Sequence, residues 1–193
     1  MYHHSQLNKL TMETYKLKNG KTLQVFNEET PENPREWDNL STMICFHRRY
    51  NLGDKHNYNH NDYSGWEEMK DAIVENESPA IILPLYLYDH SGITISTSPF
   101  SCGWDSGQIG WVLIGEDKLK REYDVTEITD EIYERGMKVL LSEVELYDNY
   151  LTGEVYGFTL LDENGEIEDS CSGYFGSDLD KNGILDAVGG ELV

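Results

Sequence analysis

A cysteine, a histidine and an aspartate with the residue types of a catalytic triad lie near the middle of the chain. Cys102 stands in a glycine-containing loop, and His90 stands in a turn twelve positions earlier. A thiol becomes a nucleophile when a neighbouring imidazole takes its proton, and a carboxylate orients that imidazole. Asp105 or Asp89 would supply the carboxylate, and the loop glycines would let backbone N–H groups approach an oxyanion. The stretch therefore predicts a small cysteine-dependent hydrolase or transferase, with Cys102 as nucleophile and His90 as base.

The same stretch, residues 83–114, also fits a purely structural role. Its aromatic side chains would form one packed layer of the core; they are Tyr86, Tyr88, Phe100, Trp104 and Trp111. The order and spacing of His90 and Cys102 match no protease signature. The chain also holds no phosphate-binding glycine loop, dinucleotide fingerprint or zinc knuckle. We therefore favour a protein that is not an enzyme and uses no cofactor, and keep the cysteine-dependent enzyme as the alternative.

A polar loop, residues 51–64, contains the residue types of a metal site. They are Asp54, His56, His60 and Asp62, with His47 close by in the sequence. The spacing matches no ligand pattern of zinc or of another transition metal, and long polar loops are more often solvated. We expect no metal at this loop.

A second acidic stretch near the C-terminus resembles the opening of a calcium-binding loop. Asp178, Asp180 and Asn182 have the spacing of its first three ligands. Such a loop needs a bidentate glutamate at its twelfth position, where this chain has Gly189, and Glu191 comes two positions too late. The stretch is therefore interpreted as a cap and turn before a short helix.

Alternating apolar and polar residues predict hairpins at both ends of the chain. Residues 13–26 turn at Asn19-Gly20, which favours a type I′ turn with a positive φ at both positions. Residues 154–161 and 167–175 form a second hairpin across Asn164-Gly165. Between the hairpins, further strands are predicted at residues 41–47, 80–88, 93–96 and 108–114.

Three segments have helical features. A Ser64-x-x-Glu67 capping box begins a helix that extends to about Glu75, and residues 116–123 form a helical turn. A long helix is predicted to begin at Asp124–Glu127 and to end at Gly153. The fold class is therefore α+β, with a mostly antiparallel sheet built from hairpins and three or four helices packed on it. Residues 12–193 are predicted to form one domain after a disordered leader, residues 1–11.

Negative charge dominates the composition, with 36 acidic and 15 basic side chains and a net charge of −21. Such a chain repels nucleic acid and anionic membrane surfaces. No apolar run is long enough to cross a membrane, and three scattered cysteines favour reduced thiols. We expect a cytoplasmic protein whose few basic residues, such as Arg48 and Arg49, pair with neighbouring carboxylates. High solubility is the simplest purpose of this charge.

The acidic residues of the long predicted helix lie opposite its apolar stripe. They are Glu127, Asp130, Glu131, Glu134 and Glu145. A row of carboxylates on one face would bind a basic surface in the way that phosphates do. These residues therefore predict a binding site for a host or element-encoded protein, with a solvated helix face as the alternative.

Four motifs carry a resemblance to a known group of proteins. They are ENPREWDNLSTMICFHRRYNLGD, LPLYLYDHSGITISTSPFSCGWDSGQIGWV, LTGEVYGF and SCSGYFGSD. On these motifs the chain resembles small acidic proteins carried by phages and integrative mobile elements of bacteria and archaea, and the resemblance covers most of residues 12–178. The resemblance implies an accessory protein of a mobile element. Together with the negative charge, the resemblance leads us to expect a protein that acts by protein–protein binding. The most specific form of this expectation is an acidic, nucleic-acid-mimicking inhibitor of a host defence system such as CRISPR or restriction.

Overall fold

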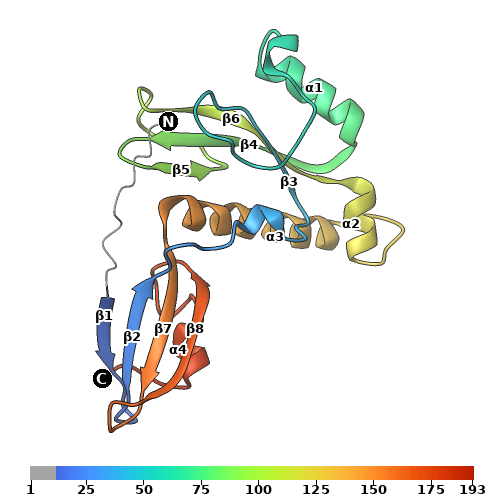
Figure 1. Ribbon diagram of the computed structural model, residues 1–193. Coiled ribbons are helices and arrows are strands. Elements are labelled where there is room, and N and C mark those ends of the chain that lie inside the picture. Colours follow the sequence, from blue (N-terminus) through green and yellow to red (C-terminus); the bar gives the residue numbers. More distant parts are fainter. Residues whose placement is uncertain (1–11) are drawn as a thin grey trace. The chain divides into compact units, whose positions relative to one another are not determined.

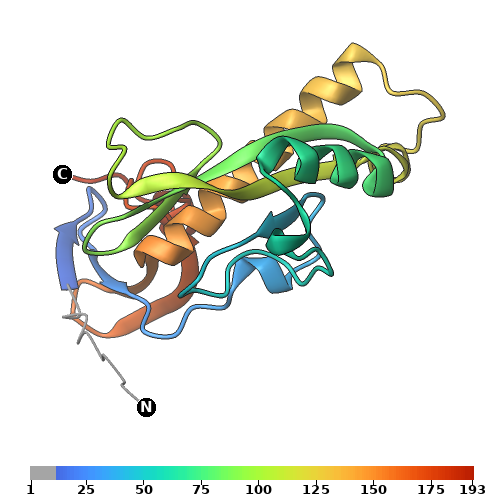
Figure 2. The same ribbon diagram turned by 90° about the horizontal axis from the view of Figure 1, so that it is seen from above.

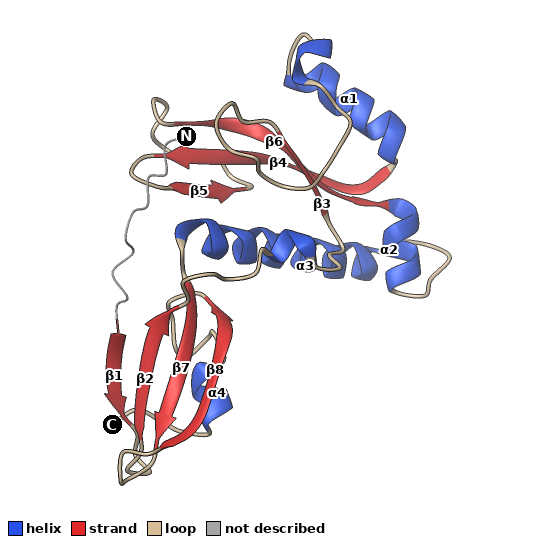
Figure 3. Ribbon diagram, in the orientation of Figure 1, coloured by secondary structure: helices blue, strands red, loops and turns tan. Residues whose placement is uncertain are grey.

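The computed structural model describes residues 12–193, which form helices and antiparallel strands (Figures 1 and 3). The predicted α+β class, with antiparallel sheets and helices, is confirmed. Contacts divide the chain into two compact units. The larger is Pro34–Asp148, and the smaller joins residues up to Asn33 with Asn149–Val193. The predicted leader, residues 1–11, lies outside the described residues. The predicted single domain stays a prediction.

The smaller unit is a four-stranded antiparallel sheet with a short helix on one face. Its strands are β1 (Met12–Lys16), β2 (Thr22–Asn27), β7 (Val155–Leu161) and β8 (Ile167–Phe175), in the order β1-β2-β7-β8, and its helix is α4 (Ile184–Val188). Alternate residues of β2 and β7 form the core against Ile184 and Val188 of α4. Because β8 is the last strand in this order, one of its edges has no neighbouring strand among residues 12–193.

Both predicted hairpins of the smaller unit are present, but the type I′ turn was wrong. Gly20 has a φ of +88°, whereas Asn19 has no positive φ. The N–H of Gly20 donates to the carbonyl of Leu17 at 3.0 Å, and Leu17 N–H donates to the carbonyl of Lys21. This pattern is a type I turn followed by a glycine in the left-handed region, the usual three-residue hairpin loop. Gly165 closes the second hairpin in the same way.

The larger unit is a second antiparallel sheet covered by helices on both faces. Its strands are β3 (Thr42–Cys45), β6 (Ser106–Gly115), β4 (Pro79–Asp89) and β5 (Ile93–Ser96), in the order β3-β6-β4-β5. Helix α1 (Trp66–Glu77) covers one face. The other face is covered by helix α2 (Glu116–Glu122) and by helix α3 (Asp130–Thr152), which belongs to this unit as far as Asp148 (Figures 1 and 2). All residues from Ile109 to Ile114 are buried, which explains the unbroken apolar run of β6.

The two predicted helix starts differ from those observed. Helix α3 begins at Asp130, because Thr129 and not Asp124 supplies its cap: the Thr129 hydroxyl accepts from the N–H of Ile132 at 3.3 Å. Asp124 instead has a φ of +50° and follows the end of α2. At α1, the carboxylate that reaches back to Ser64 belongs to Glu68, one residue after the predicted capping box.

Two short 3₁₀ helices, Pro34–Glu36 and His60–Asp62, lie in the loops on either side of β3.

Candidate functional site

The structure joins two of the three residues of the predicted catalytic triad. His90 Nδ1 lies 3.1 Å from an Asp105 carboxylate oxygen. They meet because Tyr88 pairs with Ser106 in the β4–β6 ladder, so the residues that follow one strand and precede the other are neighbours. The alternative orienting residue, Asp89, is held by an ion pair with Arg49.

The predicted nucleophile is not part of this arrangement. Across residues 12–193, no hydrogen bond joins the Cys102 thiol to His90, and the Cys102 carbonyl accepts the Ser106 hydroxyl. The side chains of His90 and Asp105 are 63% and 42% exposed, so water screens their interaction. The geometry therefore gives the cysteine-dependent enzyme no support, and it stays a prediction.

The other two cysteines lie in opposite environments. Cys45 is buried at the end of β3, and burial together with the nearby Asp54 raises the pKa of its thiol to about 12. Cys171 is exposed on β8. A thiol acts as a nucleophile or ligand only after losing its proton, so Cys45 is inert at neutral pH.

The polar loop between β3 and α1 uses its aspartate and one histidine to cover the open edge of β3. Asp54 accepts from the N–H of Met43 at 2.8 Å and donates its own N–H to the Met43 carbonyl. His56 Nε2 lies 3.0 Å from the Cys45 carbonyl, so this nitrogen carries the proton. Sheet edges need such cover, and the loop supplies it from residues 53–56. Gly53 permits the close approach: its φ is +69°, and a Cβ there would lie 2.5 Å from the Met43 carbonyl oxygen.

The other residues of this loop that have metal-ligand side chains make separate contacts. His60 packs against the rings of Phe46 and Trp66, and Asp62 accepts from the side chain of Asn59. In residues 12–193, no three His, Cys, Asp or Glu side chains converge on a point where an ion would bind.

The second acidic stretch forms the expected turn before α4. Asp178 pairs with Lys181 at 2.7 Å and accepts the N–H of Asp180. The interaction with Lys181 and, to a smaller extent, the hydrogen bond from Asp180 lower the pKa of Asp178. The Asn182 side chain accepts the N–H of Ile184, the first residue of α4. The interpretation as a turn is therefore confirmed.

A buried arginine that the sequence did not single out anchors this whole region. Arg35 binds the Asp54 carboxylate with two nitrogens, Nε at 3.0 Å and Nη2 at 2.6 Å, and Nη2 also donates to the Ser41 carbonyl. Its third nitrogen lies 3.5 Å from Glu143 of α3, which accepts the N–H groups of Leu40 and Ser41. Only 3% of the Arg35 side chain is exposed. The network fastens the chain before and after β3 to helix α3.

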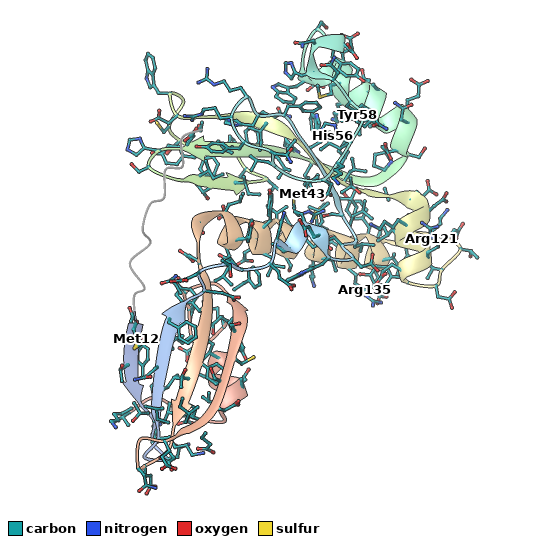
Figure 4. All side chains as sticks on the ribbon, in the orientation of Figure 1. Met12, Met43, His56, Tyr58, Arg121 and Arg135 are labelled. Atoms are coloured by element: carbon teal, nitrogen blue, oxygen red, sulfur yellow. The ribbon has the colours of Figure 1, made fainter. Side chains whose placement is uncertain are left out.

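Next to this network, residues between Cys45 and Asn61, Asp54 among them, line a hollow of about 890 Å³. His56 and Tyr58 lie near each other in its wall, on the α1 side of the larger unit (Figure 4), with ring centroids 6.2 Å apart. A hydrogen bond from the Tyr58 hydroxyl to Glu77 ties the loop to the end of α1. Burial raises the pKa of Tyr58 to about 12, and the hydrogen bond to the Glu77 carboxylate is the next largest cause.

One of the residues that line this hollow, His47, is followed in the sequence by two arginines, Arg48 and Arg49. His47 Nδ1 accepts the N–H groups of Arg49 and Tyr50, and the rings of His47 and Tyr50 stack with centroids 4.9 Å apart. Burial, followed by the positive charges of Arg49 and Arg48, lowers the pKa of His47. A second hollow of about 300 Å³ shares His47 and Arg48 and is bordered by Trp104, which is 98% exposed.

The acidic residues predicted to bind a partner are all exposed but do not form a continuous row. Glu127 precedes α3, and Asp130, Glu131 and Glu134 occupy its first turns. Arg135 and Lys138 follow on the same exposed side before Glu145 is reached. The guanidinium of Arg135 lies over the ring of Tyr123, 4.3 Å from its centroid. These two positive charges interrupt the continuous row of carboxylates that a mimic of nucleic-acid phosphates requires.

A more uniform acidic surface lies at the β7–β8 hairpin. Residues 154–180 contain eight acidic residues and no lysine or arginine. Every residue of β8 from Ile167 to Gly173 is exposed. Glu168 pairs with Lys21 at 2.6 Å, and Glu163, Glu166 and Asp169 have no ion-pair partner within residues 12–193. The sequence contained this charge count, but only the strand order shows that the charges lie along an open edge.

None of the helices formed by residues 12–193 has an apolar stretch long enough to cross a bilayer. No protein family, no curated protein and no solved structure matches this chain, so the resemblance to acidic proteins of mobile elements stays a prediction.

Proposed function

We propose that this protein acts by protein–protein binding, and that the open edge of β8 takes up an extended basic segment of its partner. The observation that carries the proposal is a nine-residue edge strand, Ile167–Phe175, which is exposed from Ile167 to Gly173 and lies beside a group of unpaired carboxylates.

The backbone supports strand addition at this edge. Within residues 12–193, no strand pairs with the outer side of β8. The N–H of Ser170 donates to the Asp169 side chain instead of to a backbone carbonyl, which indicates that it points away from β7. An open edge with free N–H and C=O groups binds an extended peptide through backbone hydrogen bonds, and neighbouring side chains select the sequence.

The side chains favour a basic partner over a second copy of this protein. Glu163, Glu166 and Asp169 lie on or next to the edge. Pairing of two β8 edges would bring the same carboxylates to one interface, and like charges facing each other across strands are unfavourable. A segment rich in lysine or arginine would meet opposite charge and associate faster.

The resemblance to accessory proteins of mobile elements gives this binding a biological context. A phage or integrative element gains from blocking a nuclease of a CRISPR or restriction system, whose nucleic-acid groove is basic. We include this inhibitory role in the proposal. The interrupted charges of α3 make the β8 edge, and not α3, the surface that we expect to bind.

A labelled nine-residue peptide of alternating lysine and valine tests the proposal, with a glutamate–valine peptide as its control. We expect fluorescence anisotropy to show binding of the basic peptide only, with an affinity that falls at least tenfold between 50 and 200 mM salt, because ionic contacts are screened. Replacing Glu166 and Asp169 by lysine should remove most of the binding.

Two variants separate edge pairing from general attraction to an acidic protein. Ser170→Pro removes an outward N–H and also the hydrogen bond from the Ser170 hydroxyl to the Phe158 carbonyl of β7, so Ser170→Ala, which removes only that hydroxyl, is its control. The proline should also abolish binding, whereas the alanine should retain it. The matched control reverses the charges of Asp130 and Glu131, which are also exposed, on α3, and should leave binding unchanged. Equal loss in the control, or full binding by Ser170→Pro, would overturn the assignment to β8.

A further inference from the structure

The hollow formed by residues 45–61 has the size of a small-molecule binding site. Its volume of about 890 Å³ falls within the range of about 300 to 1,000 Å³ that is typical of ligand pockets. It belongs to the larger unit and involves no residue of β8, so what it binds is independent of the function proposed above.

Positive charge at this hollow is left without a partner, although the chain as a whole is strongly acidic. Arg48 and Lys55 line the hollow, and neither has an ion-pair or hydrogen-bond partner in the described part of the chain. The only carboxylate in the lining is that of Asp54, which Arg35 already neutralises. An anion entering here would meet two free cations and one neutralised carboxylate.

The protonation of His47 agrees with a positive electrostatic potential at the hollow. Its Nδ1 accepts two backbone N–H groups, so its proton lies on Nε2, which remains a free donor. The pKa of His47 is lowered by burial and by Arg49 and Arg48. A bound anion would offset the repulsion from both arginines, and it would therefore raise this pKa.

The same hollow also offers flat ring surfaces and amide groups. Tyr50 and Tyr58 line it, and Tyr50 already stacks on His47 with an interplanar angle of 11°. Asn51 and Asn61 line it as well, and their side chains have no hydrogen-bond partner in residues 12–193. Aromatic faces stack on nucleobases, and amides bind the donor and acceptor edges of bases.

We propose that the hollow of residues 45–61 binds a nucleoside phosphate, with Arg48 and Lys55 on the phosphate and a tyrosine ring against the base. A guanidinium and an ammonium are the side chains that bind phosphate most strongly. A free nucleotide fits better than a nucleic-acid chain, because the net charge of −21 repels a long polyanion.

Calorimetry with AMP, ADP and ATP tests the proposal, with adenosine, phosphate and pyrophosphate as partial ligands. We expect ADP and ATP to bind at least tenfold more tightly than adenosine or phosphate, because each partial ligand lacks one set of contacts. Absence of binding by any nucleotide at millimolar concentration would overturn the proposal. Pyrophosphate binding as tightly as ADP would overturn the base contact, and tighter binding of a single-stranded oligonucleotide would overturn the choice of a free nucleotide.

Substitutions of exposed side chains locate the site without endangering the fold. Arg48→Gln and Lys55→Gln should each weaken ADP binding by tenfold or more, whereas Arg121→Gln, an exposed arginine of α2, should not change it. In NMR titrations, ADP should raise the pKa of His47 in the unmodified protein. An unchanged His47 titration, or an equal effect of all three substitutions, would place the ligand elsewhere and refute the assignment.

Discussion

Replacing Arg35 by methionine should destabilise the larger unit more than any other single arginine substitution in it. The methionine fills similar volume but leaves the carboxylates of Asp54 and Glu143, 20% and 13% exposed, without their shared cation. Breaking a buried ion pair on one side typically costs about 3–5 kcal/mol. Both carboxylates keep backbone N–H donors, from Met43 and from Ser41 among others, so we expect the lower end, about 3 kcal/mol.

Urea unfolding followed by tryptophan fluorescence measures this loss. With a slope of about 2 kcal/mol/M for a chain of this size, the midpoint should fall by about 1.5 M. The melting temperature should fall by about 6–12 °C. Arg48→Met is the matched control, because Arg48 is exposed and unpaired, and it should change stability by less than about 0.5 kcal/mol.

A double-mutant cycle with Asp54→Asn separates the ion pair from a general packing defect. The two residues are in direct contact, so their effects should differ from additivity by more than about 1 kcal/mol. If Arg35→Met lowers the free energy of unfolding by no more than Arg48→Met does, or if the effects in the cycle are additive, the Arg35 network does not stabilise the fold as inferred here.

Four further measurements test other parts of the structure. Gly110→Ala should abolish cooperative folding of the larger unit or cost several kcal/mol, because a Cβ there would lie 1.9 Å from a backbone carbonyl oxygen of β3; a native-like urea midpoint would contradict this. Iodoacetamide at pH 8 should modify Cys171 in the native protein and Cys45 only after unfolding, as mass spectrometry of tryptic peptides would show. Because the pKa of His47 is lowered, the folded state binds this proton less readily than the unfolded chain, so stability should fall as pH drops below about 6.5; urea titrations at pH 7.5 and 5.5 should show less of this loss in His47→Gln. All four tryptophans belong to the larger unit, so if the predicted single domain is right, fluorescence and far-UV circular dichroism should give one coincident transition.

Local signals predicted the elements of this fold well. Asn-Gly pairs between alternating strands identified both hairpins, since the glycine supplies the positive φ that the turn needs. The apolar run from Ala80 to Tyr88 indicated a strand covered on both faces or central in an antiparallel sheet, and β4 is a central strand of its sheet. The start of α3 was predicted wrongly for a local reason. Both Asp124 and Thr129 have side chains that can cap a helix, and only the structure shows that Asp124 follows the end of α2 while Thr129 caps α3.

The candidate sites depended on contacts between residues that are far apart in the sequence. His90 and Asp105 were correctly associated because the register of two adjacent strands joins them. Arg35 was not recognised, because its partners Asp54 and Glu143 are 19 and 108 positions away and no periodicity links them.

Turn chemistry, side-chain alternation and charge counts are local properties, so the α+β class, the two hairpins and the excess of negative charge could be predicted from the residues. Where the negative charge lies on the folded surface depends on the tertiary structure. On α3, two basic residues share the exposed side with the carboxylates. On β8, the strand order leaves an edge open beside them. The tertiary structure also brought His90 beside Asp105 and placed the unpaired basic side chains Arg48 and Lys55 at the hollow of residues 45–61. Such arrangements depend on which strands pair and how loops return to them, and these are long-range properties of the folded chain.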